Sequence, residues 1–170
     1  MKLRTRGRWG VQAGLLAGMA VAAFFFILDL VRLAPFSTPL FLSRSLLEAA
    51  FSLDSANAKQ GETLLDALAS LSQGGRLAAY TAVHLAVSAV LGMFASALAN
   101  LFHVGWNGRT GAAAGLIVGF ATWLAASQVG PVWLAGAHLT PEIVIGGGIV
   151  GGTVLGWYLR LCRLDAQEAG

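Results

Sequence analysis

The sequence has little charge for its length. Only 11% of its 170 residues are Asp, Glu, Lys or Arg, whereas a soluble globular domain carries roughly 25%. Hydrophobic residues make up 56% of the chain. A composition so poor in charge argues against a water-soluble globular protein and indicates a membrane protein.

Cysteine is almost absent as well. The single cysteine, Cys162, cannot form an intrachain disulfide, and one thiol is too few for a cysteine-based metal site. We interpret Cys162 as a buried or interfacial thiol at the end of the last hydrophobic run. The fold therefore depends on helix packing and hydrogen bonding.

What the sequence does contain is long uncharged runs. A helix that crosses a membrane needs roughly 20 apolar residues. Four runs qualify once their flanking residues are counted. We predict an all-α polytopic membrane protein, one membrane domain over residues 1–170, with transmembrane helices near residues 10–33, 77–102, 111–130 and 142–160.

The first run follows a basic start, as a signal peptide would. It is longer than the roughly 7–15 apolar residues of a signal peptide, and no A-x-A cleavage site follows it closely. We therefore expect it to stay as an uncleaved span.

Basic residues flank the runs on one predicted side, which is the cytoplasmic side by the positive-inside rule. The sequence thus predicts a multi-pass membrane protein with both termini in the cytoplasm. The net charge of +3 reflects this topology, and no nucleic-acid partner is expected. The residues on this side are Lys2, Arg4, Arg6, Arg8, Arg109, Arg160 and Arg163.

Small residues recur every fourth position in all four runs. Such GxxxG-type seams let helix backbones approach closely in lipid, where little hydrophobic force drives helices together. We predict that they hold the bundle together. The seam residues are Gly14, Gly18, Ser88, Gly92, Ser96, Gly111, Gly115, Gly119, Gly148, Gly152 and Gly156.

The outer segment, residues 36–75, links the first two predicted spans. Leucines recur with helical period within residues 40–53 and 62–73, which predicts two amphipathic helices lying on lipid or on a partner. Thr38-Pro39 is predicted to cap the first of these helices. Thr140-Pro141 is predicted to cap the fourth span, with threonine at the N-cap and proline at the first helical position.

A few polar residues interrupt the apolar runs near their outer ends. Ionisable groups inside a membrane are functional candidates. Asp29 and His84 are predicted to lie at similar depth, with Tyr80 one turn from His84. We predict a polar cluster of Asp29, Tyr80 and His84, joined by Arg32. The alternative is that Asp29 lies at the interface and pairs with Arg32 alone.

No pattern typical of a catalytic or metal site is present. The chain lacks a phosphate-binding loop, a Ser–His–Asp order and the spacing of a metal site, so we predict neither an enzyme nor a bound metal. The three histidines, His84, His103 and His138, leave haem ligation through His84 as a minor alternative. No cofactor is predicted.

Three short patterns resemble small four-helix bacterial inner-membrane proteins of uncharacterised function. The first run ends in an F-x-x-x-D-L pattern, a P-x-x-T-P turn follows, and Y-T-x-x-H opens the second span. The matching positions are Phe25, Asp29, Leu30, Pro35, Thr38, Pro39, Tyr80, Thr81 and His84. The resemblance covers the first two spans; it implies a four-helix membrane fold and a shared Asp29–His84 feature, but no activity.

Two functions from different classes are compatible with these patterns. The first is a non-catalytic structural or accessory subunit that packs against a larger inner-membrane assembly through its glycine seams and the outer amphipathic helices. Its partners would be lipids, other membrane subunits or further copies of itself. The second is a small proton- or solute-handling protein that uses Asp29, His84 and Tyr80. Haem or quinone binding is a third and weaker alternative.

Overall fold

The computed structural model describes residues 2–42, 73–101, 105–129 and 139–168. The fold is all-helical, with α1 (Lys2–Val31), α4 (Gln73–Leu101), α5 (Gly108–Val129) and α7 (Pro141–Glu168). Each helix contains a stretch long and apolar enough to cross a membrane, namely Arg8–Val31, Gly74–Leu98, Gly108–Gln128 and Pro141–Cys162. This confirms the prediction of an all-helical chain with four candidate spans.

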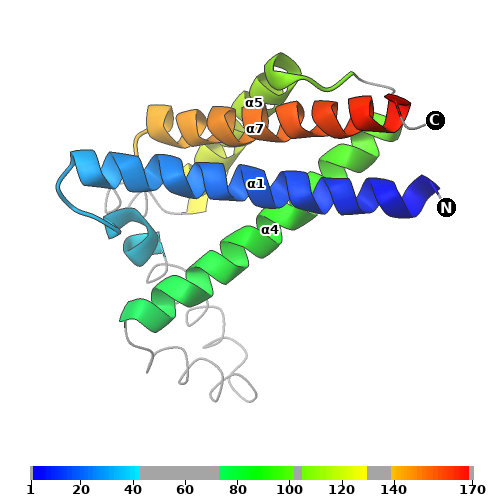
Figure 1. Ribbon diagram of the computed structural model, residues 1–170. Helices are drawn as coiled ribbons and strands as arrows, with labels where there is room; N and C mark the ends of the chain where they lie inside the picture. The colour runs from blue at the N-terminus through cyan, green and yellow to red at the C-terminus, as the bar shows by residue number, and fades with distance from the viewer. Residues whose placement is uncertain (1, 43–72, 102–104, 130–138, 169–170) are drawn as a thin grey trace, which may run out of the picture.

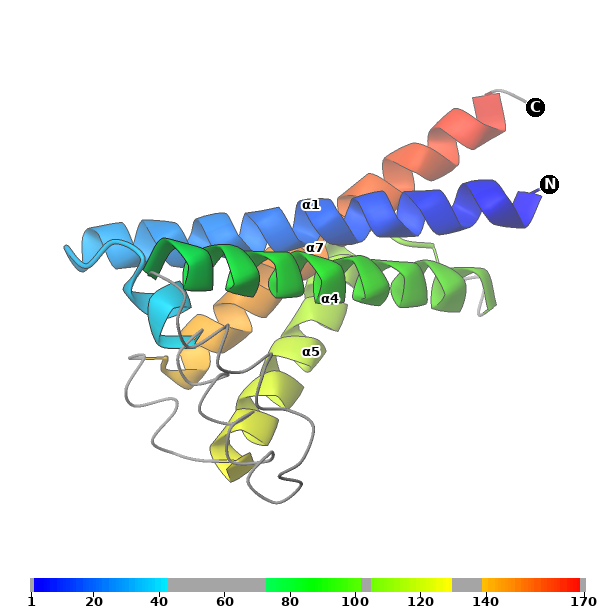
Figure 2. The same ribbon diagram turned by 90° about the horizontal axis from the view of Figure 1, so that it is seen from below.

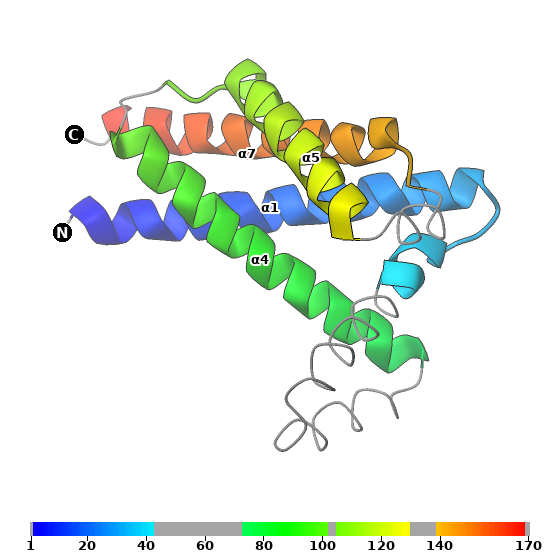
Figure 3. The same cartoon turned by 180° about the vertical axis from the view of Figure 1, so that it is seen from behind.

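The four helices pack in the spatial order α4, α1, α7, α5. Helix α4 packs on α1, α1 packs on α7, and α7 packs on α5. Helices α4 and α5 cross their neighbours obliquely (Figure 3). Both chain termini lie at the same end of the molecule (Figures 1 and 2), as an even number of spans requires.

Glycines allow α5 and α7 to approach at backbone contact. A Cβ atom at Gly115 would overlap the Gly148 carbonyl oxygen and lie 3.1 Å from the Gly152 Cα atom. A Cβ atom at Gly152 would lie 2.7 Å from the Gly115 Cα atom. Only residues without a side chain fit at such a crossing, because real Cβ atoms do not come this close to backbone atoms.

The crossing of α1 and α4 is built in the same way. A Cβ atom at Gly10 would lie 2.9 Å from the Gly92 carbonyl oxygen, and one at Gly14 would overlap the Ser88 carbonyl oxygen. The Ser88 hydroxyl lies against Gly18 but donates to the His84 carbonyl oxygen of its own helix, at 2.8 Å. Ser88 therefore contributes small size at this crossing, and its hydrogen bond stays within α4.

The contact between α1 and α7 combines glycines with aromatic rings. Phe24 packs on Gly146 and Phe25 packs on Gly147, where added Cβ atoms would lie 3.2 Å from ring carbons. At the other end of this contact the Tyr158 hydroxyl donates to Gln12 Oε1 at 3.0 Å. Helix α7 thus uses one set of glycines against α5 and another against α1.

Helix α5 begins with a reciprocal cap. Asn107 Oδ1 accepts hydrogen bonds from the backbone N–H groups of Arg109 and Thr110, at 2.9 and 3.0 Å. The Thr110 hydroxyl oxygen in turn accepts from the Asn107 N–H at 2.8 Å. Asn107 is therefore the N-cap of α5, and it satisfies two of the donors that a helix start leaves unpaired.

Replacing Asn107 by alanine is expected to lower the free energy of unfolding by about 0.5–2 kcal/mol, because the two N–H groups lose their acceptor. Thermal unfolding of the purified protein in detergent measures this. Asn107→Asp keeps an acceptor oxygen in the same place and is the matched control. Equal loss in both variants would contradict the capping role.

The Thr-Pro pairs begin their helices in two different ways. Thr140 is the N-cap of α7 as predicted, since its carbonyl oxygen accepts from Ile143 and Val144, and Pro141 is the first helical residue. The short helical segment 37–42 starts earlier than predicted, because the Leu40 N–H donates to the Phe36 carbonyl oxygen. Thr38 therefore lies inside the first turn. The predicted amphipathic helices lie almost wholly in residues 43–72, outside the described residues.

Candidate functional site

The candidate site begins where α1 ends and the chain turns back. The Ala34 N–H donates to the Asp29 carbonyl oxygen at 2.9 Å, and the Leu33 N–H donates to the Leu30 carbonyl oxygen at 3.0 Å. With Leu33 in the left-handed region (φ 57°), these bonds form a Schellman cap. Phe36 is left-handed too (φ 63°), so the turn contains two non-glycine residues in a conformation that costs roughly 1–2 kcal/mol each.

The Asp29 side chain stabilises this turn through hydrogen bonds. Asp29 has no exposed surface, and Thr38 is 3% exposed. Asp29 Oδ2 accepts from the Thr38 N–H at 2.8 Å, and Oδ1 accepts from the Thr38 hydroxyl at 2.6 Å. Hydrogen bonds to a charged acceptor contribute more than neutral ones. The pair therefore offsets the cost of the turn and anchors segment 37–42 to the end of α1.

Tyr80 and His84 lie together on α4, facing α1. Their rings stack with centroids 6.1 Å apart. His84 Nε2 lies 3.1 Å from the Gly18 carbonyl oxygen. Because a carbonyl oxygen only accepts, this contact selects the tautomer with its proton on Nε2, in which Nδ1 is an acceptor. His84 thus links α4 to α1 through one ring nitrogen and keeps the other available.

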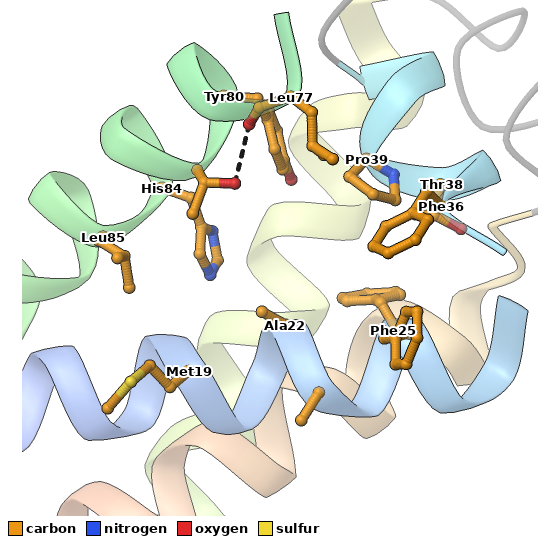
Figure 4. A pocket seen from close by; sticks show the side chains of 13 residues that line it. Met19, Ala22, Phe25, Phe36, Thr38, Pro39, Leu77, Tyr80, His84 and Leu85 are labelled. Carbon is orange, nitrogen blue, oxygen red and sulfur yellow. Dashed lines mark hydrogen bonds between the residues drawn. The ribbon is translucent and has the colours of Figure 1, made fainter. Parts of the chain in front are cut away.

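A cavity of about 360 Å³ lies between the C-terminal half of α1 and the N-terminal half of α4. It forms because the two helices touch at their glycine crossing and separate toward the N-terminal end of α4 (Figure 1). Segment 37–42 and the preceding turn supply its third wall (Figure 4). The lining residues are Met19, Ala22, Ala23, Phe25, Phe26, Phe36, Thr38, Pro39, Leu77, Tyr80, Thr81, His84 and Leu85; we call this space the α1–α4 cavity.

The structure pairs the predicted cluster residues differently from the sequence pattern. Tyr80 and His84 stack and line the cavity, whereas the Asp29 carboxylate bonds to Thr38 and Asp29 is not among the lining residues. Arg32 lies exposed just beyond the end of α1. That all four side chains form one cluster stays a prediction.

Thr38 is a candidate site residue whose contact with Asp29 the sequence pattern does not predict. It belongs to both parts of the site, because it lines the cavity and also binds Asp29. The signal in the sequence was a threonine-proline pair nine residues after a carboxylate, at the start of a helical segment. Such a pair indicates a local cap, and nothing in the sequence shows that the acceptor comes from the preceding helix.

Metal and haem ligation gain no support from the described part of the chain. Within it, no group of three or more His, Cys, Asp or Glu side chains could hold a metal ion. Haem ligation through His84 Nε2 would compete with its contact to the Gly18 carbonyl oxygen. His103 and His138 lie outside the described residues.

Comparison of the chain with protein-family models, with curated proteins and with solved structures gives no match.

Proposed function

We propose that this protein is a four-span integral protein of the bacterial inner membrane that acts as a non-catalytic structural or accessory subunit. Four helices long and apolar enough to cross a membrane support the first part of this proposal. In this view the GxxxG-type seams hold the chain itself together, since the glycines of α5 and α7 meet each other, as do those of α1 and α4.

The observation that supports the subunit proposal is the exposed apolar surface of α4. In its most apolar stretch 11% of the residues are buried, compared with 17% in α5, 17% in α7 and 22% in α1. Large apolar side chains recur along it with helical spacing and are about half exposed, namely Val83, Val87, Val90, Leu91 and Phe94. These residues form the α4 stripe. A helix at the edge of a row can be covered by lipid or by a neighbouring protein, and we propose a protein.

Site-specific photocrosslinking in the native membrane tests this proposal. A photoreactive phenylalanine in place of Val87 is expected to give one protein adduct of defined mass, and the same substitution of Val83 or Phe94 is expected to give the same adduct. Ile117 on α5, which is 66% exposed, serves as the comparison position. If the α4 positions give lipid adducts alone, the subunit proposal is wrong.

The topology carries its own prediction. With both termini on the cytoplasmic side, green fluorescent protein fused to either end is expected to fluoresce, and alkaline phosphatase fused to either end is expected to be inactive. This follows from the positive-inside rule and an even number of spans. Phosphatase activity at one end alone would contradict four spans, and activity at both ends would contradict the orientation.

Proton or solute handling is the second candidate, because Tyr80 and His84 line a cavity between two candidate spans. The engagement of Asp29 with Thr38 favours a structural role for the carboxylate. An Asp29→Asn variant separates the two roles, since an amide cannot exchange a proton with bulk water as a carboxylate does, yet it can still bond to Thr38.

A further inference from the structure

The walls of the α1–α4 cavity limit the chemistry of anything bound there. None of the 13 lining residues is Asp, Glu, Lys or Arg. An ionic group placed in the cavity would lose its hydration without gaining a counter-charge, which is costly. The lining therefore favours an uncharged occupant over an ionic one such as the headgroup of a phospholipid.

The cavity is also rich in aromatic surface. Phe25, Phe26, Phe36 and Tyr80 all line it, and the Phe26 and Phe36 rings lie 5.0 Å apart. Planar rings gain favourable stacked or edge contacts from such neighbours. At about 360 Å³ the cavity is at the lower end of the roughly 300–1,000 Å³ typical of small-molecule sites. A single substituted ring fits these dimensions better than a fused multi-ring system.

Two of the four polar lining groups already donate within the protein. The Thr81 hydroxyl donates to the Leu77 carbonyl oxygen at 2.8 Å, and the Thr38 hydroxyl donates to Asp29. The other two are the Tyr80 hydroxyl and His84 Nδ1, neither of which bonds to any residue in the described part of the chain. Figure 4 shows Tyr80 directed into the space between α4 and α1, beside the His84 imidazole.

Together these two groups offer one donor and one acceptor to the same ring. The Tyr80 hydroxyl can donate to a ring oxygen, and His84 Nδ1 can accept from a ring hydroxyl. A quinol provides both an oxygen acceptor and a hydroxyl donor, whereas the oxidised quinone provides acceptors alone. Met19, Ala22 and Ala23 are exposed on the α1 side of the cavity, which leaves a path for an apolar tail into the membrane.

We propose that the α1–α4 cavity binds the head ring of a neutral lipid-soluble quinol, held by hydrogen bonds to Tyr80 and His84. This binding site goes beyond the subunit function and does not depend on it. Asp29 is a positioning residue for the site, because it holds Thr38 and with it the wall formed by Phe36 and Pro39.

Binding of decylubiquinol to the full-length protein in phosphatidylcholine nanodiscs tests this proposal, with empty nanodiscs subtracted and oxygen excluded. We expect saturable binding of one molecule per chain, weaker for decylubiquinone. Tyr80→Phe keeps the stacked ring and removes the hydroxyl, so it is expected to weaken binding roughly three- to tenfold. Ala22→Leu fills the cavity and is expected to abolish saturable binding.

Val118→Leu is the matched control, because Val118 is 52% exposed on α5 and does not line the cavity; it is expected to bind as the wild type does. Nitrogen NMR of the histidine rings, with His84 identified from its loss in His84→Ala, should show a shift of the Nδ1 signal on binding. Absence of saturable binding overturns the proposal. Equal binding by wild type and Tyr80→Phe also overturns it, because that result indicates an acyl chain or another apolar occupant.

Discussion

Replacing Gly115 by alanine is expected to separate α5 from α7 and to lower the free energy of unfolding by about 2 kcal/mol or more. The added methyl group would overlap the Gly148 carbonyl oxygen. Overpacking of a tight contact costs typically about 1–3 kcal/mol, and here the obstructing atoms belong to a helix backbone, which cannot rotate away as a side chain can. Thermal unfolding in dodecyl maltoside, followed by size-exclusion profile, measures the loss.

Gly108→Ala in the same helix is the matched control for this prediction. A Cβ atom at Gly108 would meet only the Thr153 side chain, at 3.8 Å, which is an ordinary van der Waals distance. Since alanine also has the higher helix propensity, this variant should be as stable as the wild type or slightly more stable. If Gly115→Ala and Gly108→Ala behave alike, backbone contact between α5 and α7 is not what stabilises the pair.

Replacing Asp29 by alanine is expected to release segment 37–42 from α1, with a loss of about 3 kcal/mol in the free energy of unfolding. The reason is that the buried Thr38 N–H and hydroxyl lose their common acceptor, and hydrogen bonds to a charged group contribute about 1.5–3 kcal/mol each. The two left-handed residues of the turn, Leu33 and Phe36, would then relax. Faster hydrogen exchange of the Thr38 amide reports this change directly.

Asp29→Asn separates the hydrogen-bonding role of Asp29 from its charge. The asparagine oxygen can accept from the Thr38 N–H, and its amide can donate to the Thr38 hydroxyl oxygen, so both partners stay satisfied. This variant is expected to lose about 1–2 kcal/mol, less than Asp29→Ala, because two bonds to a charged acceptor become neutral bonds. If it is as unstable as Asp29→Ala, hydrogen bonding to Thr38 is not what makes Asp29 stabilise the turn.

The two predictions concern different stages of the architecture. The glycine crossings fix how near the helices lie, and thereby where α1 and α4 must diverge. The Asp29–Thr38 pair then closes the resulting gap on one side with Phe36 and Pro39. Loss of a glycine crossing is expected to change the shape of the α1–α4 cavity by moving α4 or α7. Loss of the Asp29–Thr38 pair is expected to change it by releasing the wall formed by Phe36 and Pro39.

Local sequence features predicted the helices well because each depends on neighbouring residues. The four apolar runs, with their flanking residues, reach the length that a membrane requires, and Thr140-Pro141 marks the start of α7. The Asn107 cap was missed, although Asn107 precedes Thr110 by the three residues of a capping box.

The sequence by itself determined that this chain is helical, that four stretches can cross a membrane, and where small residues leave room for close packing. These properties follow from composition and from spacing along one helix. Only the tertiary structure decided which partner each polar group bonds to. Asp29 meets Thr38 only after the chain turns, and His84 meets Gly18 only after the helices cross. The α1–α4 cavity likewise arises from the angle between two helices, which no single helix encodes.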